Sequence, residues 1–351
     1  MARALKRQRA VALCIFDPAG QAHLVQKMQK RLGVKVFDIG HLAQIPGAIG
    51  NQQPEMQAML AQQLALSGAG QAAVLGTGAS LNPIDNILRA GYLRQMLELT
   101  FPHVKGYDVS GTVVEIGKNV KSVKIGDDVF ARPNQMDAGS VAEFARIQED
   151  ELAIKPSNMT HEQAASVPLA GLTAWQALVT KGKIKKGSKV LIHAGSGGVG
   201  TLAIQIAKHF GAFVATTTSG KNAGFVKELG ADLIINYTTQ NFEDELSDYD
   251  LVIDTIGGET LARSFKVLKK GGTMVSVKSQ DNDNLAEKYG VHFEWFFMSP
   301  DGKMLSELAK LISQGTVKTV IDSIFRMNQA AEAFDRLATG RAKGKIVIAV
   351  K

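Results

Sequence analysis

The hydrophobic positions after residue 157 follow two alternating periods. Short apolar runs rich in Val and Ile predict buried strands at 189–193, 212–218, 233–236, 251–256 and 273–277. Apolar residues at helical spacing predict helices at 199–210, 223–229 and 259–268. The motif Thr160-His161-Glu162-Gln163 has the pattern of a capping box and predicts that a further helix begins there. This repeated order of strand and helix predicts an α/β fold with a parallel, doubly wound sheet.

The pattern before residue 157 is different. Residues 80–155 are strand-like, with runs rich in Val, Ile and Phe at 109–116 and 124–131 and with glycines between them. This predicts a small, curved, mostly antiparallel β domain. Residues 1–75 are rich in Gln and Ala and show no clean alternation, although 54–66 has the spacing of a helix.

The composition narrows the class of protein. The chain has 351 residues, 45% of them hydrophobic, and this length suggests about two domains. The single cysteine, Cys14, excludes an internal disulfide and any zinc or iron–sulfur site that needs several cysteines. No apolar run reaches the ~20 residues that span a bilayer, so we expect no membrane insertion.

The net charge of +7 admits three kinds of partner: a nucleic acid, a membrane surface or an anionic small molecule. Basic residues gather at the N-terminus: Arg3, Lys6, Arg7 and Arg9. We interpret them as a basic arm on a cytoplasmic protein. A mitochondrial import segment is the alternative, against which the scarcity of serine argues. The basic run at 181–189 lacks interleaved aromatic residues, so we expect no nucleic-acid partner.

The strongest motif is the glycine-rich loop Gly195-Ser196-Gly197-Gly198-Val199-Gly200. It contains G-x-G-x-x-G directly after a predicted strand and directly before a predicted helix, which is the context of a dinucleotide-binding loop. In that context Gly195 permits the tight turn, Gly197 lets the backbone approach a pyrophosphate, and Gly200 lets the helix pack close to the sheet. The helix N-terminus offers free N–H groups to the phosphates. A purely structural glycine turn is the alternative interpretation.

The end of the next strand indicates which dinucleotide binds. A site that prefers NADH usually has Asp or Glu about 20 residues beyond the loop, where it accepts the ribose hydroxyls. Here residues 216–222 contain no acid but include Ser219, Lys221 and Asn222, which suit a 2′-phosphate. The sequence therefore favours NADPH, although Ser219 and Asn222 could instead cap the following helix. Tyr237, at the end of the third strand, either contacts the same end of the cofactor or is an ordinary strand-end tyrosine.

Several further motifs follow one another along the chain. They are Ser80-Leu81-Asn82-Pro83-Ile84-Asp85, Gly106-Tyr107-Asp108-Val109-Ser110-Gly111, Leu169-Ala170-Gly171-Leu172-Thr173-Ala174, Asp254-Thr255-Ile256-Gly257-Gly258 and Gly344-Lys345-Ile346-Val347. Together with the glycine loop, they resemble the medium-chain dehydrogenase/reductase superfamily, and within it the zinc-independent quinone oxidoreductases related to zeta-crystallin. The resemblance extends over residues 80–351.

The resemblance implies a GroES-like, mostly-β catalytic domain formed by 51–156 and 300–351. A Rossmann domain that binds NADPH would be inserted at 157–299, with the substrate in the cleft between the two, and residues 1–50 would be an N-terminal extension. Asn82 is preceded by 81 residues, more than in the relatives. The expected alternating strand before Ser80 is replaced by the glycine- and alanine-rich run at 71–78, which leaves the first strands of the catalytic domain in doubt.

The resemblance also implies roles for single residues. Asn82 would approach the nicotinamide ribose, Tyr92 would line the active-site cleft, and Asp85 would orient this loop. Other residues would lie near the nicotinamide or the phosphates of the cofactor: Thr173, Ser276, Val277 and Lys343. Three aromatic residues either line the nicotinamide pocket or only pack: Trp295, Phe296 and Phe297.

Two other kinds of active site are excluded by the same motifs. The zinc branch of the superfamily carries Gly-His-Glu where this chain has Gly106-Tyr107-Asp108, so Tyr107 removes a histidine ligand. The 7 histidines are scattered without a ligand spacing and are interpreted as surface, core or capping residues, so we expect no zinc. A Ser-His-Asp hydrolase is excluded because no nucleophile elbow follows a strand.

These features predict an oxidoreductase that transfers a hydride from NADPH to a quinone or to the β-carbon of an α,β-unsaturated carbonyl. Solvent or a hydroxyl such as that of Tyr92 would donate the proton. An enoyl-thioester reductase and a non-catalytic NADPH-binding protein are the alternatives. The resemblance further implies a homodimer in which edge strands around 291–298 pair across a two-fold axis.

Overall fold

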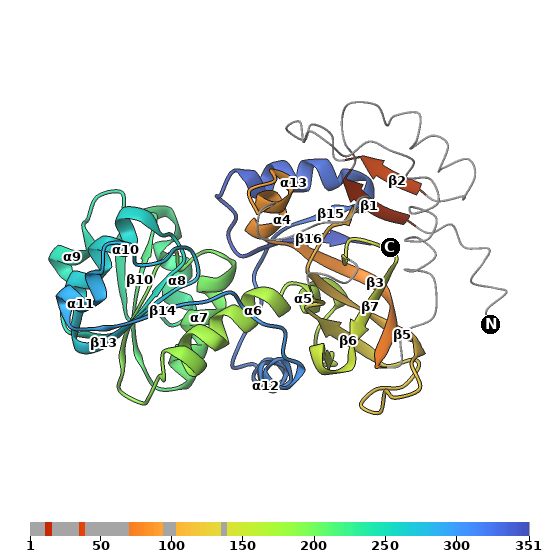
Figure 1. The fold of residues 1–351 in the computed structure, drawn as a ribbon, viewed down its shortest axis with the longest axis horizontal. Helices are drawn as coiled ribbons and strands as arrows, with labels where there is room; N and C mark the ends of the chain where they lie inside the picture. The colour runs from red at the N-terminus through yellow and green to blue at the C-terminus, as the bar shows by residue number, and fades with distance from the viewer. Residues whose placement is uncertain (1–10, 16–34, 39–69, 94–102, 135–138, 351) are drawn as a thin grey trace. The chain divides into compact units, whose positions relative to one another are not determined.

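The computed structural model describes residues 11–15, 35–38, 70–93, 103–134 and 139–350, and the helix expected at 54–66 lies outside them. The chain divides into two compact units, whose elements are labelled in Figure 1. Unit 1 consists of Met1–Pro168, Pro300–Ala309 and Ile321–Lys351, and unit 2 consists of Leu169–Ser299 and Lys310–Val320. No described helix has both the length and the apolar character needed to cross a membrane.

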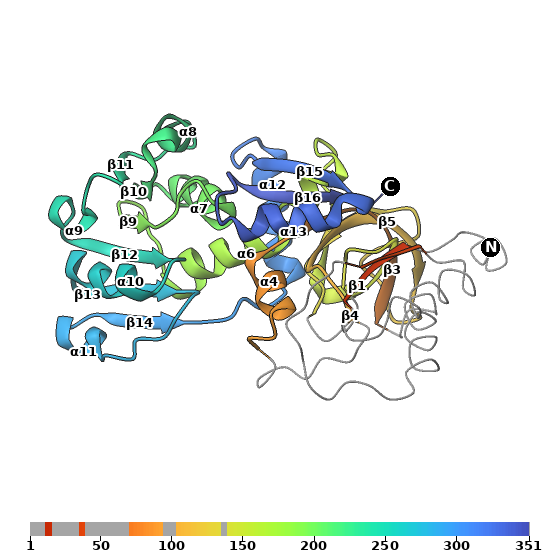
Figure 2. The same ribbon diagram turned by 90° about the horizontal axis from the view of Figure 1, so that it is seen from above.

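Unit 2 contains a six-stranded parallel sheet. Its strands are β9 (Lys189–Ile192), β10 (Phe213–Thr218), β11 (Leu233–Asn236), β12 (Tyr249–Asp254), β13 (Leu268–Ser276) and β14 (His292–Trp295). Their order across the sheet is β11-β10-β9-β12-β13-β14, as Figure 2 shows. All neighbours are parallel. Counted along the chain, this is the 3-2-1-4-5-6 order of a dinucleotide-binding Rossmann fold, so the predicted α/β class is confirmed.

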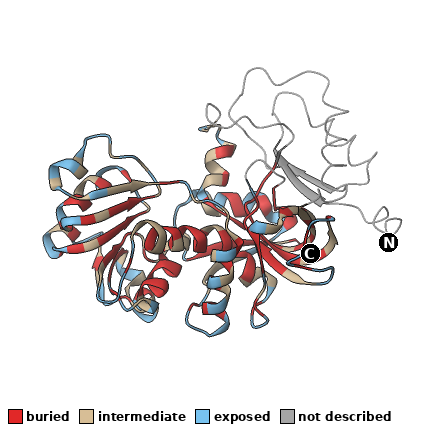
Figure 3. Cartoon of the chain, turned by 60° about the horizontal axis from the view of Figure 1, so that its bottom comes forward, coloured by how far each residue is buried: buried red, intermediate tan, exposed pale blue. Residues whose placement is uncertain are grey.

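Helices precede and connect the strands of this sheet. They are α6 (Pro168–Trp175), the π-helix η2 (Gln176–Lys181), α7 (Gly198–His209), the 3-10 helix η3 (Gly220–Asn222), α8 (Ala223–Glu228), α9 (Phe242–Glu245), α10 (Gly258–Ser264), the 3-10 helix η4 (Phe265–Val267) and α11 (Leu285–Tyr289). The helix predicted at 259–268 is shorter than expected, because the chain tightens into η4 after Ser264 and enters β13 at Leu268. The middle of the sheet is buried (Figure 3), with Leu191, Val252 and Met274 in one apolar cluster.

Unit 1 is built on a seven-stranded, mostly antiparallel sheet. Its strands are β3 (Gln71–Leu81), β5 (Asp108–Ile116), β6 (Asp128–Ala131), β7 (Phe144–Gln148), β8 (Leu152–Ile154), β15 (Ile321–Arg326) and β16 (Lys345–Ala349). The order is β15-β16-β3-β5-β6-β8, with β7 paired to β3. Strand β16, from the end of the chain, pairs antiparallel with β3. The predicted β domain therefore combines two distant segments of the sequence.

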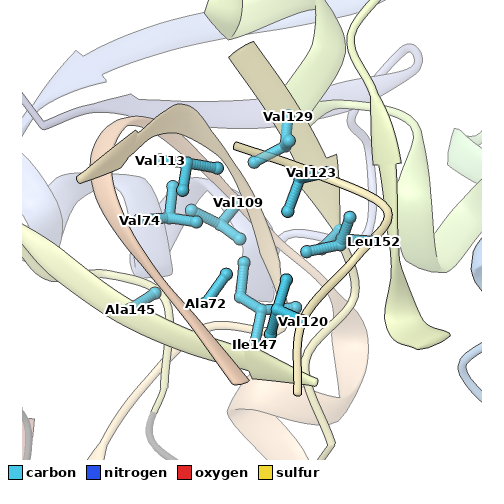
Figure 4. Packing of buried hydrophobic residues seen from close by; sticks show 11 residues of the cluster. Ala72, Val74, Val109, Val113, Val120, Val123, Val129, Ala145, Ile147 and Leu152 are labelled. Atoms are coloured by element: carbon cyan, nitrogen blue, oxygen red, sulfur yellow. The ribbon is translucent and has the colours of Figure 1, made fainter. Parts of the chain in front are cut away.

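Valine side chains fill the core of this sheet. Val74, Val109 and Val113 are buried beside Ile147 and Leu152 (Figure 4). The strand predicted at 109–116 is confirmed as β5. The run at 124–131 becomes strand only from Asp128, because a turn precedes it in which the Asp127 N–H donates to the Lys124 carbonyl.

Strand β3 occupies the run at 71–78 that the sequence left in doubt. Its residues alternate between half-buried and buried positions, but the buried ones include Ala72, Gly76 and Gly78 rather than large apolar residues. A Cβ on Gly76 would lie 2.9 Å from the Ala142 carbonyl oxygen, and one on Gly78 would lie 2.9 Å from that of His161. The expectation that this strand is replaced is therefore wrong, because close backbone contacts here require residues too small to show a hydrophobic alternation.

The remaining described elements belong to neither of these two sheets. They are the strands β1 (Val11–Ile15), β2 (Lys35–Asp38) and β4 (His103–Val104), and the helices α4 (Pro83–Arg89), η1 (Glu149–Glu151), α5 (His161–Ala165), α12 (Gly302–Ser313), η5 (Met327–Gln329) and α13 (Ala330–Ala338). Strand β1 pairs parallel with β2 and antiparallel with β4. The capping box before α5 is confirmed: the Gln163 N–H donates to Thr160 Oγ1 at 3.2 Å, and the Thr160 N–H donates to Gln163 Oε1 at 2.9 Å.

Candidate functional site

The glycine loop joins the end of β9 to the start of α7. The backbone turns at Ala194, whose φ of 55° lies in the left-handed region. That conformation costs about 1–2 kcal/mol for a residue with a Cβ. Gly195, expected to permit the turn, has no positive φ; instead a Cβ there would lie 2.1 Å from Thr216 Oγ1. Glycine is needed at 195 because β10 passes so close.

The other two glycines of the motif differ in the space around them. A Cβ on Gly200 would lie 2.3 Å from the Ala194 carbonyl oxygen, so this glycine allows α7 to pack against the loop. A Cβ on Gly197 would meet only the same oxygen, at 3.3 Å. The helix makes its first i→i−4 bond from the Thr201 N–H to the Gly197 carbonyl. The N–H groups of Gly198, Val199 and Gly200 are therefore available to a ligand at the positive end of a 12-residue helix.

The hydroxyl of Ser196 is oriented by two neighbours. Its oxygen accepts a hydrogen bond from Thr218 Oγ1 at 3.0 Å and another from Asn222 Nδ2 at 3.1 Å. A hydroxyl has two lone pairs and one proton. Both lone pairs are used here, so the proton of Ser196 is left to donate to a third group.

The residues predicted to bind the 2′-phosphate, Ser219, Lys221 and Asn222, lie in the segment directly after β10. Neither Ser219 nor Asn222 makes a side-chain capping bond to the helix that follows it. Capping therefore does not explain these two residues, and the Asn222 amide turns to Ser196 instead. Lys221 is exposed, and Tyr237 is 50% exposed, with its N–H donating to the Thr218 carbonyl at 3.1 Å.

The ends of β12 and β13 are held together by Asp254. Its Oδ1 accepts the N–H groups of Ile256 and Gly257 at 3.0 and 2.9 Å, and its Oδ2 accepts the hydroxyl of Ser276 at 2.8 Å. The Val277 N–H donates to the Asp254 carbonyl at 3.1 Å. The fully buried Ser276 side chain thus fixes the backbone at the carboxyl ends of β12 and β13.

The other residues expected near the nicotinamide lie at separate points of unit 2. Thr173 is buried in α6, where its hydroxyl donates to the Leu169 carbonyl at 2.7 Å. Phe296 is 9% exposed and belongs to the core, whereas Phe297 is 51% exposed and meets the ring of Trp295 edge-on at 5.0 Å. Phe296 therefore packs in the core, and whether any of the three aromatic residues also lines the nicotinamide pocket stays a prediction.

In unit 1, Asn82 belongs to a buried network around the ammonium group of Lys345. Lys345 Nζ donates to the Leu81 carbonyl at 3.0 Å, to Asn82 Oδ1 at 2.5 Å and to Asp108 Oδ2 at 3.2 Å. The same Asp108 oxygen accepts the Ser80 hydroxyl at 2.7 Å and Asn82 Nδ2 at 2.8 Å. An ammonium group has three donors, so Lys345 is fully paired and fixes which way the Asn82 amide faces.

Asp85 ties the loop of Asn82 to the neighbouring Gly106 segment. Its two carboxylate oxygens accept the N–H groups of Asn82 at 2.8 Å and of Gly106 at 3.1 Å. Burial raises the pKa of Asp85 to about 6. Burial also lowers the pKa of Lys105 to about 8, and its Nζ has no hydrogen-bond partner among the described residues. These contacts fit the orienting role that the sequence suggested for Asp85.

Tyr92 and Lys343 lie outside this network. Tyr92 is 80% exposed in the turn after α4. Lys343 is exposed, and its backbone N–H donates to Asp322 Oδ1 at 2.8 Å. The lysine that enters the network is Lys345, two residues later. Its motif was visible in the sequence, but only the pairing of β16 with β3 places it beside Asn82.

The described residues do not fit a zinc ion. No three His, Cys, Asp or Glu side chains gather to hold a metal in the described ranges between residues 11 and 350. Tyr107 stands where the zinc branch has a histidine ligand, and the neighbouring Asp108 is paired with the Lys345 ammonium. That positive charge would repel a metal cation.

Three residues of unit 1 are arranged like the Ser-His-Asp triad of a hydrolase but cannot act as one. Ser110 Oγ lies 2.8 Å from His161 Nδ1, and His161 Nε2 lies 3.6 Å from Asp128 Oδ1. Ser110 is fully buried, however, and its hydroxyl donates to the Val129 carbonyl at 2.9 Å. A buried serine whose proton is held by the backbone cannot attack a substrate.

Two family profiles match parts of the chain. Residues 68–157 match the family profile described as "Alcohol dehydrogenase GroES-like domain", and residues 229–348 match the one described as "Zinc-binding dehydrogenase". The chain is 36% identical over 315 residues to "NAD(P)H oxidoreductase RTN4IP1, mitochondrial" of Danio rerio, covering 78% of this chain and 81% of that protein. It is 40% identical over 281 residues to "2-methylene-furan-3-one reductase" of Solanum lycopersicum, covering 77% and 69%.

Solved structures extend this similarity to the fold. The quinone oxidoreductase of Coxiella burnetii is 36% identical with a TM-score of 0.75, over 82% of this chain and 92% of that one. The Escherichia coli quinone oxidoreductase, solved with NADPH, is 26% identical with a TM-score of 0.74, over 82% and 93%. The Rossmann strand order, the glycine loop and these relatives agree, and the chain belongs to the medium-chain dehydrogenase/reductase superfamily, in the branch of the quinone oxidoreductases.

Proposed function

We propose that this protein is an NADPH-dependent oxidoreductase that reduces a quinone or the β-carbon of an α,β-unsaturated carbonyl. The observation that carries the proposal is the glycine loop, where three backbone N–H groups at the start of α7 are free and Gly197 leaves space for a phosphate. The relatives support the substrate class, since their names include a 2-methylene-furan-3-one reductase and an alkenal/one oxidoreductase.

The cofactor chemistry is supplied by NADPH, which when bound carries the hydride. The residues of this chain recognise its phosphates. The free proton of Ser196 and the exposed ammonium of Lys221 suit a 2′-phosphate, and no acid between 216 and 222 opposes it. We therefore propose that the protein prefers NADPH to NADH.

On the substrate side, we propose that Asn82 contacts the nicotinamide ribose. Lys345 and Asp108 hold the Asn82 amide in one orientation, so the amide itself is preorganised. Further contacts with the cofactor are proposed for residues that the family motifs indicate: Thr173, Ser276, Val277, Tyr237 and Lys343. The proton that completes the reduction comes from solvent or from the Tyr92 hydroxyl.

Zinc independence is part of the proposal. The positive charge beside Asp108 is supplied by Lys345, and no step of the reaction is assigned to a metal. Dialysis against a strong chelator should leave the rate of NADPH oxidation unchanged. A rate that falls and is restored by zinc would contradict this part of the proposal.

The main test is the variant Gly197→Ala, assayed by stopped-flow loss of NADPH absorbance with a quinone and with an enone. The new methyl group would lie 3.3 Å from the Ala194 carbonyl oxygen, a tight contact that a shift of a few tenths of an ångström relieves, so stability should fall only slightly while the pyrophosphate is displaced. We expect NADPH affinity to fall at least tenfold, or about 1.4 kcal/mol. Wild-type protein that oxidises NADPH with neither acceptor would overturn the proposal and favour a non-catalytic NADPH-binding protein.

The proton donor is tested with Tyr92→Phe. Because Tyr92 is 80% exposed, the change should leave stability within about 0.5 kcal/mol of wild type. If the hydroxyl donates the proton, kcat falls by about 10²-fold. An unchanged kcat assigns the proton to solvent.

A second candidate function is the reduction of an enoyl thioester. A solved enoyl reductase, CurK, is 26% identical with a TM-score of 0.75 and covers 82% of this chain and 93% of that one. The two functions are separated by comparing kcat/KM for an enoyl-CoA with that for the free enone of the same carbon skeleton. A preference of tenfold or more for the thioester would favour the second candidate.

We also propose that the protein is a homodimer and lies in the cytoplasm. Strand β14 is the last strand of the unit 2 sheet, so its outer edge can pair with a second copy. Light scattering after size exclusion tests the dimer, and a monomer mass would contradict it. Several relatives are named mitochondrial or chloroplastic, so a fluorescent fusion of the full chain is the test of location, and signal within an organelle would overturn the cytoplasmic proposal.

A further inference from the structure

His193 lies between the end of β9 and the glycine loop and is almost completely buried. Its side chain is 1% exposed and packs edge-on against the ring of Phe242, with the ring centroids 4.8 Å apart. Both ring nitrogens have partners. Nδ1 lies 3.0 Å from Thr217 Oγ1, and Nε2 lies 2.8 Å from Ser264 Oγ.

The direction of these hydrogen bonds follows from Ser264. Its hydroxyl donates to the Thr260 carbonyl at 2.5 Å, and a hydroxyl has only one proton. Ser264 Oγ must therefore accept from His193 Nε2, which carries the ring proton. A neutral imidazole then has a lone pair at Nδ1, so Thr217 Oγ1 donates to it.

Thr217 connects the histidine to the backbone of the loop. Its Oγ1 accepts the N–H of Ala194 at 3.2 Å, and its carbonyl accepts the N–H of Gly195 at 3.0 Å. These bonds hold Ala194 at a φ of 55°, which residues with a Cβ rarely adopt. The Ala194 carbonyl in turn accepts the Gly197 N–H at 2.9 Å, and thereby sets the turn into α7.

We propose that His193 is a positioning residue for the cofactor. As the neutral Nε2–H tautomer it orients the Thr217 hydroxyl, and Thr217 holds the glycine loop in the shape that receives the pyrophosphate. His193 acts through Thr217 and Ala194 and does not itself touch the cofactor. The inference rests on the NADPH binding proposed above.

The surroundings of His193 keep its ring neutral. Burial lowers the pKa of His193 to about 4, against an opposing attraction from Asp254 at the end of β12. The other charged groups that face it are Arg263 on α10 and Glu243 on α9. These two pair with each other, with Arg263 Nη2 donating to Glu243 Oε2 at 2.6 Å, and their effects on the pKa of His193 are opposite, since Arg263 lowers it and Glu243 raises it. A proton on Nδ1 would remove the lone pair that orients Thr217.

The test compares two variants of Thr217 by titration calorimetry with NADPH. Thr217→Val keeps the shape of the side chain but removes both hydrogen bonds, and we expect the Kd for NADPH to rise about tenfold. Thr217→Ser keeps the hydroxyl, and its Kd should stay within about twofold of wild type. His193→Phe keeps a ring against Phe242 but has no nitrogens, and should resemble Thr217→Val. At saturating NADPH, kcat should be unchanged in all three.

Gln205→Met is the control for a loss of buried hydrogen bonds away from the loop. Gln205 is 7% exposed in α7 and bonds to the Thr201 carbonyl and to both backbone groups of Lys318 at 2.8–2.9 Å. This variant should lose stability without a change in Kd. Equal Kd values for Thr217→Val, Gln205→Met and wild type would show that His193 is merely structural and would overturn the inference. Failure of wild type to bind NADPH would instead overturn the proposed function, and the inference with it.

Two further measurements keep the inference testable if a variant does not fold. Nitrogen-15 NMR of wild-type His193 at neutral pH should show a protonated Nε2 and an unprotonated Nδ1, and the opposite tautomer or an imidazolium would contradict it. In the variant Ala194→Gly the backbone adopts positive φ without help. In that background Thr217→Val should raise the Kd by about threefold or less. An undiminished tenfold rise would show that Ala194 is not the point of action.

Discussion

The two units bury polar groups of different kinds. Among the described residues of unit 1, six charged side chains are buried: Asp85, Lys105, Asp108, Arg132, Glu151 and Lys345. In unit 2 the buried polar groups are hydroxyls, amides and one imidazole, with Asp254 as the single charged residue. Members of both sets hold motif segments: Asp85, Asp108 and Lys345 hold the loop of Asn82, and Thr217 holds the glycine loop. The loop of Asn82 is therefore held by the buried Asp108–Lys345 ion pair and the buried Asp85 carboxyl group, whereas the glycine loop is held by neutral hydrogen bonds.

This difference has an energetic consequence. Removing one partner of a buried ion pair leaves an uncompensated charge and costs about 3–5 kcal/mol. Removing one neutral hydrogen bond costs about 1 kcal/mol. The loop of Asn82 should thus be fixed in every folded molecule, whereas the glycine loop should be adjustable by single substitutions. The predictions below test that contrast, beginning with the largest effect.

The largest effect is expected for Lys345→Met. Without the ammonium group, the fully buried Asp108 loses its cation at 3.2 Å, and the free energy of unfolding of unit 1 should fall by about 3–5 kcal/mol. Lys343→Met is the matched control, because that side chain is exposed two residues away and its loss should cost less than about 0.5 kcal/mol. Hydrogen exchange of peptides from β5 and β16 measures both. Similar protection in the two variants would show that the buried pair does not stabilise unit 1.

The pH dependence of stability that Asp85 causes is a second test of the buried charges in unit 1. Its pKa is raised from 3.8 to about 6 by burial, while Lys105 and Lys345 oppose the rise and Asp108 adds to it. Between these values the folded protein keeps a proton that the unfolded chain has lost, so stability falls as pH rises. The loss should be about 2 kcal/mol between pH 4.5 and 7.5. Hydrogen exchange of the α4 region at the two pH values measures it, and Asp85→Asn should remove this part of the pH dependence.

His193 should produce a pH dependence of the opposite sign in unit 2. Burial lowers its pKa from 6.5 to about 4, so the unfolded chain takes up a proton in a range where the folded protein does not. Stability should fall by about 2 kcal/mol as pH is lowered from 7 to 5. Both tryptophans, Trp175 and Trp295, lie in unit 2, so urea unfolding followed by tryptophan fluorescence reports on this unit. His193→Phe should flatten the dependence; an equal slope in wild type and variant would assign it to other groups.

The sequence predicted the architecture of unit 2 better than that of unit 1, for a physical reason. Strands such as β9 and β11 are short apolar runs with glycines and polar turns at their ends, so local pattern is sufficient to find them. Strand β3 instead depends on contacts with Ala142 and His161, distant in sequence, which require glycine at positions that should alternate. No local pattern carries that information.

The same limit applies to the site. Ser196 and Asn222 could be predicted as phosphate-binding residues because motif spacing indicates which residues lie near phosphates, and that role stays a prediction. The roles of Lys345 and His193 could not be found in this way, because they depend on which strands pair and on which hydroxyls face the ring. A buried lysine or histidine is distinguishable from an exposed one only when its neighbours in space are known.

The smallest effect concerns the glycines of unit 2, where required and replaceable positions lie close together. Gly224 is the second residue of α8, and a Cβ on it would have no atom within 4 Å. Gly224→Ala should therefore raise the free energy of unfolding by about 0.5–1 kcal/mol, since alanine loses less conformational entropy in a helix. The NADPH affinity should not change. Gly200→Ala places the same methyl group 2.3 Å from the Ala194 carbonyl oxygen and should destabilise the unit. If both variants lose the same free energy of unfolding in urea, the contact with Ala194 does not explain the glycine at position 200. The backbone of the glycine loop would then move more easily than its hydrogen bonds indicate.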